Sequence, residues 1–228
     1  MKLLPFDKMP KEFQNDEVKP YYDILFAKRK SLVVKRCFDI LVSLIMIILL
    51  AIPMLIIAVL VKCTSKGPVL YKQERVTAYG KRFKILKFRT MCTNADKIGP
   101  LVTGCDDSRI TPIGKTLRRL RLDELPQIFH VLSGKMSLVG ARPEVPKYVK
   151  AYTPVMMATL IMPAGITSLA SIKFKDEDDM LANCDDIEKE YITNILPKKM
   201  VYNLKYLGRF GFRRDLYLMR KTVKDVLF

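Results

Sequence analysis

ILVSLIMIILLAIPMLIIAVLV, residues Ile40–Val61, is the stretch that decides the fold of this 228-residue chain. It carries no charged residue, and a helix of this length crosses roughly 30 Å of hydrocarbon. Pro53 lies at its middle, where a proline removes a backbone hydrogen bond and kinks a helix. The stretch therefore predicts a membrane helix that is broken near its centre.

Basic residues flank this run on both sides. Those before it are Lys28, Arg29, Lys30, Lys35 and Arg36, and those after it are Lys62, Lys66, Lys72 and Arg75. Because Lys and Arg beside a membrane segment mark the cytoplasmic side, both ends are predicted to lie there. We therefore expect a re-entrant helix, which enters the bilayer, bends at Pro53 and leaves by the same face.

Asp39 lies where the chain is expected to enter the membrane. A carboxylate at that depth is costly unless it is paired. Arg36 is three residues upstream, on the same face of a helix. We therefore expect an Arg36–Asp39 ion pair at this boundary.

The composition divides the chain into three parts and indicates an anionic partner. Residues 1–34 form a polar arm that is expected to be loose or a short surface helix, residues 35–62 the membrane helix, and residues 63–228 one catalytic domain of ordinary size. The net charge is +17, which suits nucleic acid or an anionic membrane face. With an apolar run in the same chain, the membrane needs fewer assumptions, and no nucleic-acid partner is expected. The run begins too deep, and is too long, for a cleaved signal peptide.

The cysteines and the single histidine exclude several kinds of site. Five cysteines form no C-x-x-C pair, which argues against a disulfide framework and for a reducing compartment. His130 is the only histidine, so a His/Cys zinc site and a His-dependent triad are not expected. Its apolar surroundings, QIFHVL, favour a structural role.

Two strands are predicted beyond the membrane run, at Val69–Val76 and Phe83–Met91, joined by a turn in which Gly80 can supply a positive φ. The second, FKILKFRTM, alternates, so that Lys87 and Arg89 share one face about 7 Å apart. This spacing suits a diphosphate. A solvated basic edge is the alternative.

Asp123 and Glu124 are adjacent carboxylates in a basic neighbourhood. The cations that could converge on them are Lys87, Arg89, Arg109, Arg118, Arg119, Arg121 and Arg142. The planar fork of arginine matches phosphate oxygens, and nearby arginines keep a carboxylate ionised, as a nucleophile or metal ligand requires. One carboxylate could attack phosphorus while the other deprotonates a second substrate. The alternative is that both only form salt bridges with Arg118–Arg121.

Four other segments predict helices or allow more than one interpretation. The acidic run Lys175–Met180 could bind a metal through Asp176–Asp179 or form a solvated loop. Helices are expected in the basic segment after Pro112 and in residues 146–160, interrupted at Pro154. Residues 202–228 suit a helix in the headgroup region, a terminal helix packed on the domain, or both.

Six motifs in order make the chain resemble the bacterial sugar transferases, the small monotopic polyprenyl-phosphate phosphoglycosyl transferases. They are KRCFDI (35–40), GPVLYKQERV (67–76), FKILKFRTM (83–91), DSRITPIGKTLRR (107–119), LDELPQ (122–127) and SLVGARPEVP (137–146). The similarity runs from about residue 35 to the C-terminus. Six ordered motifs over this length are very specific.

The resemblance implies a role for each matching residue. Asp123 would attack the β-phosphorus of a UDP-sugar, release UMP and help to bind Mg²⁺. Glu124 would activate the polyprenyl phosphate that accepts the phosphosugar. Candidate phosphate contacts are Lys87, Arg89, Arg118 and Arg142. The family's re-entrant helix, broken at a proline, matches Pro53.

The chain departs from the family pattern at three places. Ile52, and not a small polar residue, precedes Pro53. Ala141 stands second in GARP, and MPAGIT at 162–167 lacks the arginine of the usual RPGIT. These changes leave the Asp-Glu chemistry intact but remove the basis for a nucleotide or sugar contact near Met162.

The expected fold is therefore mixed α/β and helix-rich, with a re-entrant membrane helix broken at a proline, a small β-hairpin and amphipathic helices packed at the membrane surface. The expected activity transfers a sugar-1-phosphate from a UDP-sugar to a polyprenyl phosphate such as undecaprenyl phosphate, at the cytoplasmic face of a bacterial inner membrane. It would start a lipid-linked glycan such as an exopolysaccharide or capsule, and a homodimer is left open. The rivals are a non-enzymatic, membrane-anchored basic module, and a metal-dependent UDP-sugar glycosyltransferase that releases UDP.

Overall fold

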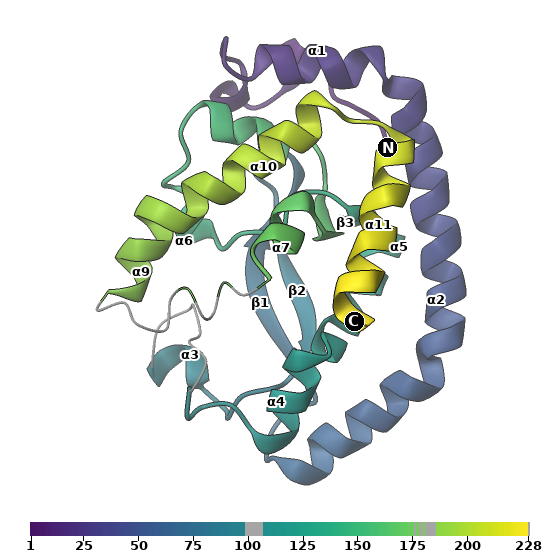
Figure 1. Cartoon of the computed structure of the whole chain (residues 1–228), viewed down its shortest axis with the longest axis vertical. Helices are drawn as coiled ribbons and strands as arrows, with labels where there is room; N and C mark the ends of the chain where they lie inside the picture. The colour runs from purple at the N-terminus through teal and green to yellow at the C-terminus, as the bar shows by residue number, and fades with distance from the viewer. Residues whose placement is uncertain (99–106, 176, 178–179, 181–185, 228) are drawn as a thin grey trace.

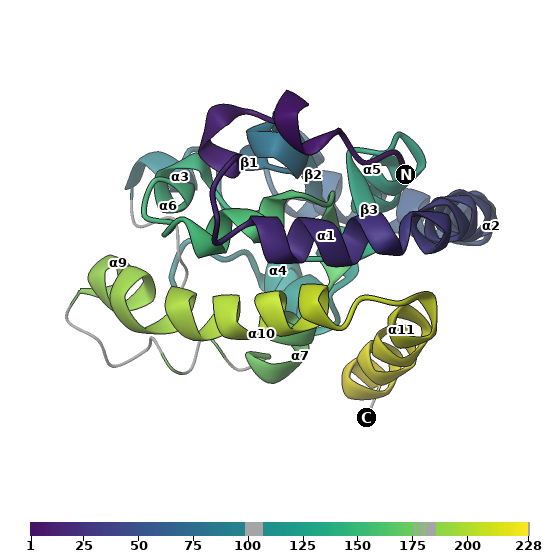
Figure 2. The same cartoon turned by 90° about the horizontal axis from the view of Figure 1, so that it is seen from above.

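The computed structural model describes residues 1–98, 107–175, 177, 180 and 186–227. A two-stranded hairpin lies at the centre, and helices surround it (Figure 1). The view from above places α10 (Leu196–Gly208) and α11 (Phe212–Leu227) in a layer to one side of that hairpin (Figure 2). The mixed, helix-rich fold class is as predicted. The remaining α-helices are α1 (Lys19–Ala27), α2 (Arg29–Thr64), α3 (Ala95–Ile98), α4 (Pro112–Arg119), α5 (Ile128–Leu132), α6 (Pro146–Val149), α7 (Leu169–Lys173) and α9 (Ile187–Glu190).

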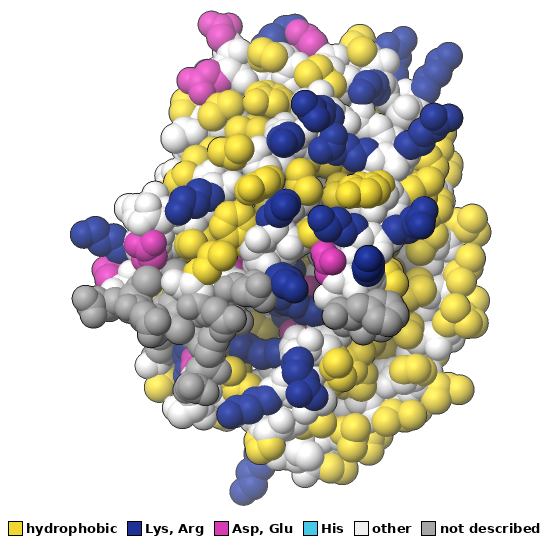
Figure 3. Space-filling view, viewed as in Figure 1, with side chains coloured by type: hydrophobic (Ala, Val, Ile, Leu, Met, Phe, Trp, Pro, Cys, Tyr) yellow, Lys and Arg dark blue, Asp and Glu magenta, His cyan; other side chains and the backbone are white. Residues whose placement is uncertain are grey.

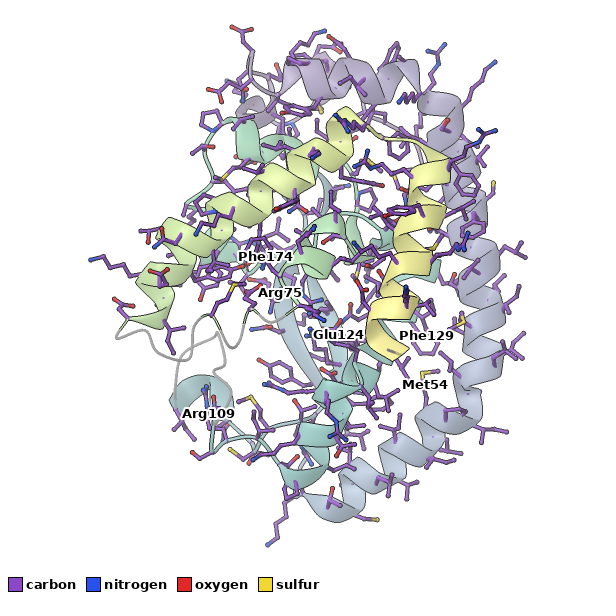
Figure 4. The ribbon with its side chains drawn as sticks, in the orientation of Figure 1. Met54, Arg75, Arg109, Glu124, Phe129 and Phe174 are labelled. Atoms are coloured by element: carbon purple, nitrogen blue, oxygen red, sulfur yellow. The ribbon has the colours of Figure 1, made fainter. Side chains whose placement is uncertain are left out.

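Helix α2 contains the apolar run and is the one helix, among the described residues, that is long and apolar enough to cross a membrane. It is continuous over 36 residues with Pro53 inside it. Its ribbon bends (Figure 1), its outer side is covered by hydrophobic side chains (Figure 3), and Met54 lies at the bend (Figure 4). Ile48 and Ile52 are 75% and 71% exposed, so the described part of this chain leaves this face largely uncovered. The helix therefore continues through Pro53 and is not interrupted there.

The predicted hairpin is present as β1 (Leu70–Val76) and β2 (Arg82–Phe88), paired antiparallel. Gly80 has a φ of 72° in the short 3-10 helix that joins them. Because strand residues alternate between faces, Phe83 and Ile85 pack against α5, while Phe88 packs on the far side against α2 and α4. The hairpin is therefore covered on both faces.

A second pair of strands was not predicted. β3 (Met136–Val139) and β4 (Ala164–Thr167) pair in parallel. A Cβ at Gly165 would lie 2.1 Å from the backbone nitrogen of Gly140, so the two glycines let these strand ends approach. Close packing of the two strands thus requires glycine at these positions of the GARP and AGIT motifs.

Residues 146–160 are helical on both sides of an interruption that includes Pro154, as predicted, but the α-helix before the proline is only four residues long. They divide into α6 and a 3-10 helix at Val155–Leu160, separated by a turn. Pro154 is the N-cap of the second element, a position at the start of a helix where a backbone N–H has no helical partner to lose. The other short elements are 3-10 helices at Phe6–Lys8, Lys11–Phe13, Ala78–Gly80 and Leu122–Gln127, and a π-helix at Tyr191–Ile195.

The N-terminal arm is packed and not loose. Phe13, Val18 and Leu25 are fully buried in one cluster with Tyr206 and Phe210. This burial joins the arm to the C-terminal helices. The partners are about 190 residues away in sequence, which is why the polar composition of the arm did not reveal it.

Candidate active site

Asp123 and Glu124 lie in the 3-10 helix Leu122–Gln127, which follows α4 directly. Arg121, at its start, has a left-handed φ of 55° and separates the two helices. Thr111 caps α4 by accepting a hydrogen bond from the Gly114 amide, and its first residue is Pro112, as N-terminal helix signals predict. As a result, Asp123 and Glu124 are buried and lie against the hairpin.

Glu124 is held by two cations from distant parts of the chain. The Nζ of Lys87, on β2, donates to Glu124 Oε1 at 2.9 Å. Arg142, which follows β3, binds both carboxylate oxygens, with Nη1 donating to Oε2 at 3.2 Å and Nη2 to Oε1. This bidentate, charge-assisted arrangement leaves little of the Glu124 carboxylate free.

Asp123 is also buried, 6% exposed, but its carboxylate accepts no hydrogen bond from the residues that the structure describes. Burial raises the pKa of Asp123, and the nearby cation Lys87 opposes the rise. Burial also pushes the pKa of Glu124 upward, but Arg142 and Lys87 outweigh it and hold that pKa well below 4.5. The two adjacent carboxylates thus differ in their hydrogen-bond partners and in the direction in which their pKa values are shifted.

The other predicted cations reach the pair to different extents. Arg118 donates from Nε to Thr90 Oγ1 at 3.0 Å and contributes to the field at Asp123. Arg109 is bonded to Asp107 and to the Ala95 carbonyl, and it lies near α3, away from Glu124 (Figure 4). Arg119 and Arg121 are exposed.

Arg89 does not join Lys87 at the carboxylates. Its Nη2 donates to the carbonyl and hydroxyl oxygens of Ser65, both at 2.7 Å. The strand ends at Phe88, and the guanidinium lies over Gly67, where a Cβ would be 2.3 Å from Nη1. Lys87 and Arg89 therefore have different protein partners, and their shared contact with a diphosphate stays a prediction. Arg89 instead ties β2 to the end of α2.

The expected Arg36–Asp39 pair is not formed. Arg36 donates to the carbonyls of Val131 and Leu132, at 2.6 and 2.8 Å, at the C-terminal end of α5. Such carbonyls lack partners within their own helix and attract cations. Asp39 accepts from the Ser137 hydroxyl at 2.7 Å. The two residues fix α2 to different elements.

His130 has the structural role that the sequence favours. Its Nε2 accepts a hydrogen bond from the Leu86 amide at 3.1 Å, and its ring meets Phe83 edge-on. Burial lowers its pKa, which keeps Nε2 an acceptor. Asp176, Asp178 and Asp179 of the acidic run lie outside the described residues.

Sequence reasoning missed the role of Arg75. Arg75 is on β1, on the hairpin face that also carries Lys87. It donates to the Pro143 carbonyl at 3.1 Å and so supports the loop that carries Arg142. Strand alternation could have indicated this face. Arg75 pairs with Phe83, and Phe83 lies on the same face of β2 as Lys87.

The donors fit a magnesium ion only together with a substrate. Among the described residues, no group of three or more His, Cys, Asp or Glu side chains is placed to hold a metal. Mg²⁺ is commonly bound by one or two carboxylates and by substrate phosphates. The unpaired Asp123 could supply one such ligand, whereas Glu124 is occupied by Arg142 and Lys87.

The comparison with family models decides the relationship. The model described as bacterial sugar transferase matches residues 30–228. The chain belongs to the bacterial sugar transferase family. Curated relatives of this sugar transferase include UDP-N-acetylgalactosamine-undecaprenyl-phosphate N-acetylgalactosaminephosphotransferase of Aeromonas hydrophila, 37% identical over 197 residues, which are 85% of this chain and 44% of that protein. Another is UDP-glucose:undecaprenyl-phosphate glucose-1-phosphate transferase of Klebsiella pneumoniae, 37% identical over 198 residues, 85% of this chain and 40% of that protein.

A third relative has a length closer to this sugar transferase. The exopolysaccharide production protein ExoY of Sinorhizobium fredii is 30% identical over 207 residues, covering 84% of each chain. The sugar transferase described here spans less than half the length of the Aeromonas and Klebsiella relatives. The long apolar helix and relatives named for a lipid phosphate together suggest a membrane protein.

Glu124→Gln is expected to flatten the acid dependence of stability. Because the folded pKa of Glu124 lies well below 4.5, the ionised carboxylate stabilises the fold above about pH 4.5, and this contribution is lost as the pH falls through the folded pKa. Thermal unfolding in detergent between about pH 6 and 3 should therefore show a steeper loss for the wild type. The exposed Glu17→Gln is the control, and parallel curves for wild type and Glu124→Gln would contradict the pairing.

Proposed function

We propose that this protein transfers a sugar-1-phosphate from a UDP-sugar to a polyprenyl phosphate and releases UMP. The observation that carries the proposal is the contrast between the two carboxylates: Glu124 is chelated by Lys87 and Arg142, whereas Asp123 accepts no hydrogen bond from any described residue. Nucleophilic attack needs a carboxylate oxygen with a free lone pair. Asp123 meets this requirement beside a set of cations suited to phosphate.

In the first step, an Asp123 oxygen attacks the β-phosphorus of the UDP-sugar. The bond from that phosphorus to the bridging oxygen breaks, and UMP leaves with the electron pair. Lys87, Arg118 and Arg142 would neutralise charge on the phosphoryl oxygens, which is the main electrostatic task in this chemistry. A bound Mg²⁺ would add further neutralisation of phosphate charge. The result is a phosphosugar bonded to Asp123.

In the second step, a phosphate oxygen of the lipid attacks the same phosphorus and the bond to Asp123 breaks. Glu124 would act as the base that accepts the proton from the lipid phosphate. Its low pKa makes it a weak base while Arg142 and Lys87 hold it. A phosphate that draws these cations toward itself would raise the pKa of Glu124, so the arrival of substrate would itself activate the base.

The site is proposed to lie at the cytoplasmic face of the inner membrane, with α2 re-entrant. Support comes from basic residues at both ends of the apolar run and from the bend at Met54. The route keeps the lipid tail in the bilayer while its phosphate reaches Asp123. Relatives named for exopolysaccharide production and for undecaprenyl phosphate favour a glycan-initiating role.

The re-entrant path predicts that Lys2 and Lys66 lie on the same side of the membrane, because α2 returns to the face from which it enters. Both side chains are exposed. Single cysteines placed there, in a variant without the five native cysteines, should react with an impermeant maleimide from the same side. Labelling from opposite sides would show a helix that spans the bilayer.

Product analysis tests the function directly. The purified protein is incubated with polyprenyl phosphate, Mg²⁺ and, in turn, UDP-glucose, UDP-galactose or UDP-N-acetylgalactosamine, the sugars suggested by relatives' names. UMP and a sugar diphospholipid are expected from at least one. UDP release would indicate transfer of the sugar alone, and the absence of either nucleotide would favour a binding module.

A further inference from the structure

Lys199, on α10, is a buried cation outside the Asp123–Glu124 pair. It is 6% exposed. Its Nζ lies 2.9 Å from Glu177 Oε2, 3.1 Å from the Tyr191 hydroxyl and 4.0 Å from Glu144 Oε1. A buried ammonium is tolerated when it is surrounded by such acceptors. The Lys199 ammonium thus lies between two carboxylates that belong to different segments of the chain.

This cluster is continuous with the loop that carries Arg142. Glu144 is two residues further along and accepts a hydrogen bond from the Tyr191 hydroxyl at 2.8 Å. Its own carbonyl accepts from the Val76 amide at 2.8 Å. Tyr191 begins the π-helix Tyr191–Ile195, and π-turns of this kind occur frequently at functional sites. Lys199 is therefore connected to the Arg142 loop by short, buried contacts.

Glu177 and Glu144 approach the same Lys199 ammonium, at 2.9 and 4.0 Å, and Glu144 is two residues from Arg142, so Glu177 lies beside the loop that carries this arginine. The pKa of Arg142 is raised, first by Glu124 and further by Glu177. Arg142 is the side chain that chelates Glu124, and its own exposure, 29%, leaves it open to a phosphate. A Glu177 without its own cation would compete for this guanidinium, because unlike charges attract strongly at low dielectric.

We propose that Lys199 is a positioning residue that neutralises Glu177 and so leaves Arg142 to Glu124 and the substrate diphosphate. The inference rests on the proposed transferase function and assigns no direct substrate contact to Lys199. It explains why a lysine is buried on α10 beside two carboxylates. It also gives Glu177 a specific partner, the Lys199 ammonium.

Lys199→Met is expected to lower kcat/KM for UMP release by about 10–100-fold, the scale of effects from displaced catalytic groups. The double variant Lys199→Met/Glu177→Gln should recover to within about threefold of Glu177→Gln, because an uncharged amide at position 177 no longer competes for Arg142. Glu177→Gln alone should stay within about twofold of wild type. Lys198→Met, at the exposed neighbouring position, is the matched control.

The comparison within the Glu177→Gln variant tests the proposal even if the single variant Lys199→Met fails to fold. In that background Lys199 should be dispensable, so a double variant more than about tenfold less active than Glu177→Gln would overturn the proposal. So would full activity of folded Lys199→Met, or a tenfold loss in Glu177→Gln. If the wild type releases no UMP from any UDP-sugar, the transferase function itself fails and the role of Lys199 falls with it.

Discussion

Asp123→Asn is expected to lose at least about 10⁴-fold in UMP release, the scale seen when a covalent nucleophile is removed. An amide nitrogen and oxygen cannot form the phosphosugar intermediate that the proposed first step requires. The variant should nevertheless fold. Burial raises the pKa of Asp123, so folding favours its uncharged form and the ionised carboxylate weakens the fold at neutral pH. An uncharged asparagine should therefore leave the unfolding temperature unchanged or slightly higher.

The measurement is UMP release with Mg²⁺ and polyprenyl phosphate, beside thermal unfolding of both proteins. Mass spectrometry after incubation with the UDP-sugar alone should detect the added phosphosugar in the wild type and not in the variant. Glu124→Gln serves as the comparison, because it retains the nucleophile and should still form the adduct. Substantial turnover by folded Asp123→Asn would remove Asp123 from the role of nucleophile.

Lys35→Met is expected to destabilise the fold by about 3–5 kcal/mol, the usual result of removing one partner of a buried ion pair. Lys35 Nζ lies 2.7 Å from Asp215 Oδ2, with both side chains only 2% exposed. Tyr206 donates to the other Asp215 oxygen at 2.7 Å. This pair joins α2 to α11, and its loss leaves a buried carboxylate with one neutral partner.

Chemical unfolding in detergent measures this effect, and the exposed pair Lys19–Asp23 provides a control. Its atoms are only 2.5 Å apart, but its side chains are 46% and 54% exposed, so Lys19→Met should cost less than about 1 kcal/mol. The double variant Lys35→Met/Asp215→Asn should regain much of the loss, because no charge is left buried. A loss below about 1 kcal/mol in Lys35→Met would show that the pair contributes little.

Much of the candidate site was predictable because its chemistry is adjacent in sequence. Asp123 and Glu124 are neighbours, and α4 before them carries its own start signals at Thr111 and Pro112. The hairpin that supplies Lys87 follows from alternation and from Gly80. Periodicity, capping and turn chemistry are local, so a single sequence displays them.

The partners of individual charges were not predictable in the same way. Arg36 was expected to bind Asp39 but reaches the end of α5, and the contact of Arg89 with Ser65 was not foreseen. In a chain of net charge +17, the sequence alone allows each cation many possible acceptors. Which acceptor it finds depends on contacts between segments far apart in sequence, including the unpredicted β3–β4 pair.

The sequence by itself determined the apolar helix with its central proline, the hairpin and the adjacent carboxylates, since each depends on residues a few positions apart. Only the tertiary structure decided that Glu124 is held by Lys87 and Arg142 while Asp123 stays unpaired among the described residues. The difference arises because the two cations come from β2 and from the loop after β3, and the packing of these elements sets their distance to each carboxylate. Burial raises the pKa of both acids, and only at Glu124 do the two bonded cations outweigh it, so their placement separates two otherwise similar acidities.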